Sequence, residues 1–91
     1  MSQVIIEKNE IIDVVKQILK DELEICDIKD NDNFFELGGD SLSAIIIICK
    51  IEKFFQVEFK VPFLYKYPTP VGMSECIYRM ITGEVVSYGG D

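Results

Sequence analysis

The 91-residue sequence contains no histidine. Histidine is the commonest general base and a frequent zinc ligand, so its absence excludes Ser-His-Asp hydrolysis and disfavours a zinc site. Long apolar runs are also missing, since the longest, residues 44–49, falls far short of a membrane span. The first residues contain no basic segment followed by a long apolar one. We therefore expect no signal peptide and a soluble, cytoplasmic protein.

Positive charge is scarce, because 9 Lys and Arg residues face 16 Asp and Glu residues for a net charge of −7. The whole imbalance lies in residues 1–40, which hold 11 acids and 4 bases, whereas residues 41–91 hold 5 of each. Nucleic acids and anionic membranes both require clustered basic residues, so we expect neither as a partner. The acidic half either favours partners with basic patches or is a solvated helix face and a polar loop.

Cysteine is sparse and widely spaced, at Cys26, Cys49 and Cys76. This odd number argues against a disulfide framework, and the absence of close pairs argues against a Cys-x-x-Cys metal site. Each cysteine has apolar neighbours, which predicts buried free thiols in a reducing compartment. A calcium loop starting at Asp30 would place Phe34 and Phe35 where an oxygen ligand and a turn glycine belong, so no metal site is expected.

Apolar residues recur every three or four positions in three stretches, which predicts three amphipathic helices. The first spans residues 9–26, with Asn9 as its N-cap. Its apolar face consists of Ile12, Val15, Leu19, Leu23 and Cys26. The last begins with Thr69 as N-cap and Pro70 in the first helical position, and it ends at Gly83. Its apolar face consists of Met73, Cys76, Ile77, Met80 and Ile81.

The middle stretch, residues 41–56, contains four consecutive isoleucines, which are also compatible with a buried strand. Its patterned length, its lack of internal turn signals and the N-cap position of Asp40 favour a helix instead. The expected inward stripe consists of Ala44, Ile47, Ile48, Ile51, Phe54 and Phe55.

Two further segments complete the predicted fold. Residues 61–66 predict a short helix with Pro62 in its first turn, ended by Tyr67-Pro68. Residues 27–33 form a polar loop, which Phe34, Phe35 and Leu37 are expected to fix to the core. The sequence thus predicts an all-α bundle of three longer helices and one short helix, with an unusually long loop between the first two. We expect one domain over residues 1–83 and a flexible tail over residues 84–91.

The Gly38-Gly39-Asp40-Ser41-Leu42 segment places a serine hydroxyl in the first turn of a predicted helix. Free backbone N–H groups there would favour a phosphate ester on Ser41, although the local sequence alone favours a serine that only helps to start the helix. Leu42, Ile45 and Cys49 share one side of the helix, and Ile46 adds to the same apolar patch. The letters Gly-Asp-Ser-Leu also mark an esterase family. That chemistry requires a histidine and a much longer α/β chain, so it is excluded.

Residues 32–42 resemble the signature of phosphopantetheine-dependent carrier proteins, and most of all the peptidyl and acyl carrier domains of nonribosomal peptide and polyketide synthesis. Residues 64–69 resemble the short third helix of this family and the start of its fourth. The resemblance covers roughly residues 10–82 and implies a four-helix bundle of acyl-carrier type. It also implies that a phosphopantetheinyl transferase attaches 4′-phosphopantetheine from coenzyme A, with Mg²⁺, to Ser41. The thiol of this arm would hold an acyl or aminoacyl group as a thioester.

The resemblance further implies a monomer that catalyses no reaction itself and presents its arm to adenylation, condensation, ketosynthase or thioesterase-type enzymes. The expected docking residues are Gly39, Asp40, Leu42, Ile45, Ile46 and Cys49, and Glu36 would help Asp40 to steer basic partners. The sequence departs from the family pattern at several positions. Ile46 and Lys50 make the second helix more apolar and less acidic than in fatty-acid carriers, Tyr65 replaces the usual Phe, and Pro70 and Gly72 are unusual.

One alternative from another class stays open. The chain would then be an unmodified helical interaction module in which Leu42, Ile45 and Ile46 form a helix-binding groove. The carried group, and the choice between a peptide and a polyketide pathway, also stay open. Met1 and the short tail favour a free-standing protein over an excised domain without deciding between them.

Overall fold

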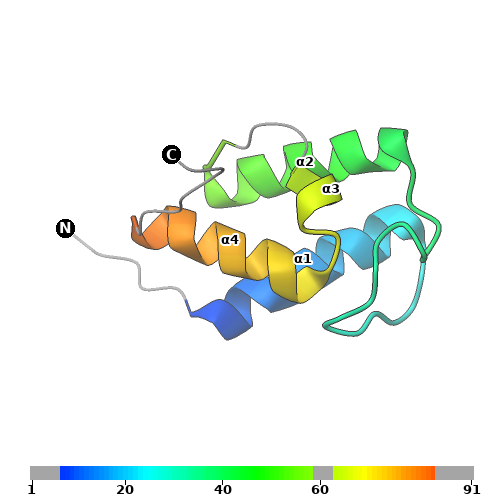
Figure 1. Cartoon of the computed structure of the whole chain (residues 1–91), viewed down its shortest axis with the longest axis horizontal. Coiled ribbons are helices and arrows are strands. Elements are labelled where there is room, and N and C mark those ends of the chain that lie inside the picture. The colour runs from blue at the N-terminus through cyan, green and yellow to red at the C-terminus, as the bar shows by residue number, and fades with distance from the viewer. Residues whose placement is uncertain (1–6, 59–62, 84–91) are drawn as a thin grey trace.

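A computed structural model describes residues 7–58 and 63–83. They form four helices, α1 (Lys8–Leu23), α2 (Ser41–Phe55), α3 (Phe63–Lys66) and α4 (Pro70–Thr82), and the described ranges contain no strand (Figure 1). α1 packs against both α4 and α2, and the short α3 contacts α2. The predicted all-α bundle with a long first connection is confirmed, and the Ile-rich run is helical. Val61 and Pro62 of the predicted short helix, and the predicted tail over residues 84–91, lie outside the described residues.

The predicted start of α1 is wrong, and its predicted inward face is confirmed at Val15 and Leu19 but not at Ile12. Its N-cap is Glu7, whose N–H donates to Glu10 Oε1 at 3.2 Å, and Asn9 lies inside the helix. The buried residues are Ile11, Val15 and Leu19, whereas Ile12 is only half-buried. Both Ile11 and Ile12 fit a period of 3.6 residues, so periodicity alone could not choose the register.

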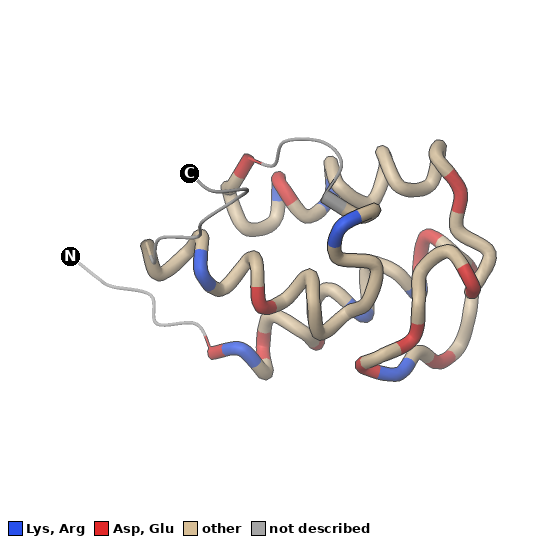
Figure 2. The backbone as a smooth tube through the Cα atoms, viewed as in Figure 1, with Lys and Arg blue, Asp and Glu red and all other residues tan. Residues whose placement is uncertain are grey.

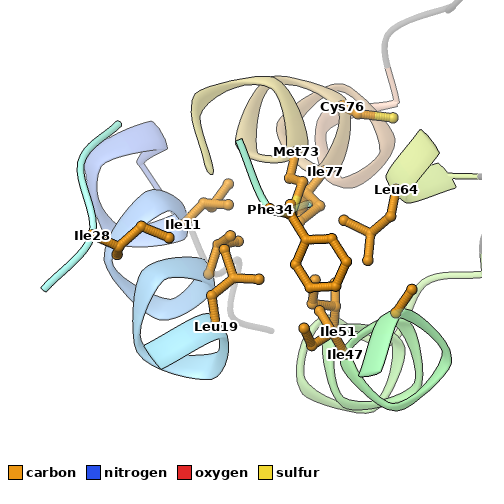
Figure 3. Packing of buried hydrophobic residues seen from close by; sticks show 12 residues of the cluster. Ile11, Leu19, Ile28, Phe34, Ile47, Ile51, Leu64, Met73, Cys76 and Ile77 are labelled. Carbon is orange, nitrogen blue, oxygen red and sulfur yellow. The ribbon is translucent and has the colours of Figure 1, made fainter. Parts of the chain in front are cut away.

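The hydrophobic core forms where α1, α2 and α4 meet, and a loop residue fills its centre. Phe34 is 0% exposed and lies among side chains from three helices, namely Ile47, Ile51, Leu64, Met73 and Ile77 (Figure 3). Burying a side chain of this size stabilises the fold by about 1.5–3 kcal/mol. Ile28, from the same loop, is buried beside α1. The connection between α1 and α2 is therefore part of the core.

Three residues predicted to lie inside are exposed instead. All three cysteines are free as expected, but only Cys76 is buried, whereas Cys26 and Cys49 are exposed. Cys26 follows the end of α1, where Glu24 adopts the left-handed conformation with φ 57°, so it is not on the helix. Phe54 is exposed with its ring against Phe55, because successive helical residues are about 100° apart and only Phe55 turns toward the core.

Backbone hydrogen bonds hold the long connection, residues 24–40, against the start of α4 and the segment just before it. The Phe34 N–H donates to the Pro68 carbonyl at 2.7 Å, and the Val71 N–H donates to the Asp30 carbonyl at 3.0 Å. Lys16 of α1 forms an ion pair with Asp30. The side-chain hydrogen bond within this pair raises the pKa of Lys16. Phe35 and Leu37 are half-buried against the core, so the predicted fixing of this loop is confirmed.

The structure also bears on the membrane and metal expectations. Over residues 7–58 and 63–83, no helix is long and apolar enough to cross a membrane. The same part of the chain contains no cluster of three or more Cys, Asp or Glu residues that could hold a metal ion.

Candidate functional site

Ser41 is the first residue of α2, and its side chain is exposed. Asp40 and Ser43 cap the helix, which confirms the prediction for Asp40. Asp40 Oδ1 accepts a hydrogen bond from the Ser43 N–H at 3.0 Å, and the Asp40 N–H donates to Ser43 Oγ at 2.9 Å. This reciprocal capping box satisfies the start of the helix without the Ser41 hydroxyl. The interpretation of Ser41 as a serine that only starts a helix is therefore wrong, because Asp40 and Ser43 do so.

The capping box also determines the electrostatics of the site. The backbone N–H of Ser43, followed by the Ser43 hydroxyl, lowers the pKa of the Asp40 carboxyl below its ordinary value of 3.8. The Leu42 N–H contributes in the same direction. The expectation of free N–H groups that would receive a phosphate ester is thus wrong for Ser43, whose N–H already donates to the Asp40 carboxylate.

The two glycines before Asp40 have different roles. Gly38 has φ 104°, a conformation that other residues rarely adopt, and no atom lies within 4 Å of the position where a Cβ would be. A Cβ on Gly39 would instead lie 2.3 Å from Cζ of Phe34. Gly39 is half-buried, and its N–H donates to the Phe34 carbonyl at 3.0 Å. The glycine pair therefore lets the chain pass closely over Phe34 before α2 begins.

The predicted apolar patch beside Ser41, consisting of Leu42, Ile45, Ile46 and Cys49, lies on the surface. Leu42 is 67% exposed, Ile45 is 59% exposed, Cys49 is exposed and Ile46 is half-buried. Residues 41–49 contain no charged residue, whereas the preceding residues 24–40 contain six acids and one base (Figure 2). Further along α2, Lys50 pairs with Glu22 of α1 at 3.1 Å. An uncharged surface thus begins at Ser41 and is bordered by an acidic loop.

The Ser41 hydroxyl has an aromatic neighbour that the sequence reasoning did not assign to the site. Tyr65 Oη of α3 lies 3.3 Å from Ser41 Oγ, within hydrogen-bonding distance. The Tyr65 ring stacks on Phe35 with centroids 5.0 Å apart and 23° between planes, and Phe35 meets the buried Phe34 edge-on at 4.9 Å. In the sequence, the only signal for this contact was that Tyr65 stands where the family usually has Phe. Tyr65 lies 24 positions after Ser41, so no local pattern could place the two side by side.

Residues 9–77 match the family described as "Phosphopantetheine attachment site". The chain belongs to this family. Its members bear 4′-phosphopantetheine covalently. An exposed serine hydroxyl that the helix cap does not need, beside an open uncharged surface, fits such a carrier. The family match also covers the acidic connection and about the first two turns of α4, so it rests on most of the folded unit.

Curated relatives of this carrier include much longer synthases. The chain is 39% identical over 71 residues to polyketide synthase PksN of Bacillus subtilis. This match covers 78% of the chain and 1% of the synthase. It is also 44% identical over 55 residues to tyrocidine synthase 3 of Brevibacillus parabrevis. That match covers 60% of the chain and 1% of the synthase. The chain therefore spans only a small fraction of these relatives.

Solved structures show the same fold for this carrier. The HMG-ACPI domain from the CurA module of Lyngbya majuscula superimposes with a TM-score of 0.78 at 26% identity, over 93% of this chain and 91% of that one. The expected four-helix carrier fold is therefore confirmed.

Proposed function

We propose that Ser41 is the attachment residue and that the chain carries acyl or aminoacyl intermediates in nonribosomal peptide or polyketide synthesis. The observation that carries this proposal is the exposed Ser41 hydroxyl at the start of α2, independent of the cap formed by Asp40 and Ser43. The carrier unit spans residues 1–83, acts as a monomer in the cytoplasm and catalyses no bond change itself.

The attachment is a group transfer by a phosphopantetheinyl transferase with coenzyme A and Mg²⁺. A bond forms between Ser41 Oγ and phosphorus, the pyrophosphate bond of coenzyme A breaks, and 3′,5′-ADP leaves. The hydroxyl proton passes to a base of the transferase or to solvent, because the described residues include no histidine and the nearby Asp40 carboxylate is engaged by Ser43. The attached group supplies a terminal thiol, which holds the cargo as a thioester.

The partners of the carrier are the transferase and adenylation, condensation, ketosynthase or thioesterase-type enzymes. We assign their docking surface to Gly39, Asp40, Leu42, Ile45, Ile46 and Cys49. Exposed Leu42 and Ile45 supply apolar area of the kind that interface centres bury. The acidic connection before α2, including Glu36 and Asp40, favours partners with basic residues at the rim of this surface.

The test is intact mass spectrometry after incubation with coenzyme A, Mg²⁺ and a broad-specificity transferase. We expect the wild-type chain to gain the mass of one phosphopantetheinyl group and Ser41→Ala to gain nothing. Ser43→Ala is the matched control, since it removes a hydroxyl two residues away and should still be loaded. If the wild type gains no mass, or if the gain survives in Ser41→Ala, the unmodified interaction module with a groove at Leu42, Ile45 and Ile46 becomes the better reading.

A further inference from the structure

A phosphodiester on Ser41 would lie beside a negative charge, and a donor from another part of the chain would stabilise it. The Asp40 carboxylate precedes it directly and is held ionised by the Ser43 N–H and hydroxyl. The Ser43 N–H, which would otherwise favour an anion at a helix start, already donates to this carboxylate. The start of α2 therefore offers an attached phosphate less stabilisation than its position in the helix indicates.

Tyr65 supplies a donor at the required place. Its hydroxyl oxygen lies 3.3 Å from Ser41 Oγ, which is long for a hydrogen bond between two hydroxyls and therefore weak. After modification, Oγ becomes an ester oxygen, and the charged oxygens of the phosphodiester are bonded to the adjacent phosphorus. A hydrogen bond to an ionised acceptor is roughly twice as strong as one between neutral groups. The same hydroxyl thus has a better acceptor in the modified chain.

The Tyr65 ring is held in place from the core outward. It stacks on Phe35 at 5.0 Å, and Phe35 packs edge-on against Phe34, which is fully buried. The Phe35 N–H also donates to Asn33 Oδ1 at 2.8 Å, which fixes the backbone that carries this ring. Because its ring is supported in this way, Tyr65 loses little conformational freedom when its hydroxyl binds an anion.

We propose that Tyr65 is a positioning residue for the phosphodiester on Ser41. Its hydroxyl donates to a charged phosphodiester oxygen and holds the first link of the arm on the α3 side of the apolar patch. A phenylalanine at this position would preserve the stack on Phe35 but could not donate this hydrogen bond. The inference rests on the proposed attachment at Ser41.

The experiment compares fully loaded wild type, Tyr65→Phe and Tyr78→Phe by phosphorus NMR, after intact mass spectrometry has verified loading. Tyr65→Phe should shift the phosphorus resonance and slow its transverse relaxation, because the phosphodiester becomes freer. Tyr78→Phe is the matched control and should leave both unchanged, since it removes a hydroxyl from α4, where Lys8 approaches the ring at 5.3 Å. Equal melting temperatures for wild type and Tyr65→Phe would show that the ring packing is intact.

The outcomes separate this inference from the proposed function. If the wild type is loaded at Ser41 but its phosphorus resonance and relaxation match those of Tyr65→Phe, the role of Tyr65 is refuted while the attachment stands. If the phosphorus signal responds equally to Tyr78→Phe, the effect is not specific to Tyr65 and the inference also fails. If no variant is loaded, the proposed function itself is wrong.

Discussion

Replacing Gly39 with alanine tests whether the loop before α2 is built on the buried Phe34 ring. The added Cβ would lie 2.3, 2.4 and 2.5 Å from three carbons of that ring. Carbon atoms in favourable contact lie about 3.5–4.0 Å apart, so something must move by more than 1 Å. Phe34 is fully buried and fills the centre of the core, so the ring has little room to move. Overpacking of this kind costs about 1–3 kcal/mol, and we expect the upper half of that range.

The assay is urea and thermal unfolding followed by far-ultraviolet circular dichroism. For a domain of this size the expected loss lowers the melting temperature by roughly 10–20 °C. Gly38→Ala is the control, because its Cβ meets no atom within 4 Å and only the positive φ of 104° penalises it, by about 1–2 kcal/mol. Phe34→Leu removes the ring and should reduce the penalty at Gly39 but not at Gly38. A loss below about 0.5 kcal/mol for Gly39→Ala would refute the reasoning, because it would match an ordinary surface change.

Three further predictions concern α2. Leu42→Ala and Ile45→Ala should change the free energy of unfolding, measured in urea, by about 0.5 kcal/mol or less. Ile47→Ala, at a fully buried position, should lower it by about 2–5 kcal/mol. Equal losses for all three variants would mean that the patch is core. Asp40→Ala should lower stability more than Asp40→Asn, because asparagine also caps helices. Since the folded-state pKa of Asp40 is lowered, the charge-dependent part of the advantage of wild type over Asp40→Ala should be complete above the ordinary value of 3.8 and be lost as pH falls through the lower folded value. Thermal melts at several pH values check this, and an advantage that does not shrink in acid would count against it. Gln56→Gly should raise stability by about 0.5–1 kcal/mol in urea unfolding, because Gln56 ends α2 at φ 60°; a decrease would contradict the strain argument.

The ends of α2 and α4 could be predicted from the sequence because their signals are local. Asp40 caps α2, and Thr69 caps α4 by accepting from the Gly72 N–H at 3.1 Å. Gly83 ends α4 in the left-handed conformation, with φ 80°. Each of these signals depends on hydrogen bonds or dihedral angles within a few residues. The start of α1 was missed because Asn9 is a better capping type than Glu7, yet the N-cap lies two residues earlier, where Glu7 and Glu10 form a capping box.

Contacts between distant segments could not be predicted in the same way. The exposed position of Ser41 and of the patch beside it followed from the helical period once Asp40 was taken as the cap. The approach of Tyr65 to Ser41 depends on how α3 packs against α2, and no local pattern in the sequence indicates that packing. Burial of Ile28 likewise depends on the path of the connection across α1, and its polar neighbours gave no apolar periodicity to indicate it.

The length of the connection between α1 and α2 has a structural reason that also explains the site. A shorter loop could join the two helices, but it could not reach the start of α4, where Asp30 bonds to Val71, or the segment before α4, where Phe34 bonds to Pro68. Because of that path, Phe34 lies at the centre of the core and Gly39 packs against its ring. The Phe34 ring therefore fixes the position at which the chain enters α2. The exposed Ser41 hydroxyl is thus positioned by a buried residue seven places earlier in the chain. Substitutions at Phe34 or Gly39 should therefore disturb the site even though neither residue bonds to the hydroxyl, whereas changes at Leu42 should alter only what the surface contacts.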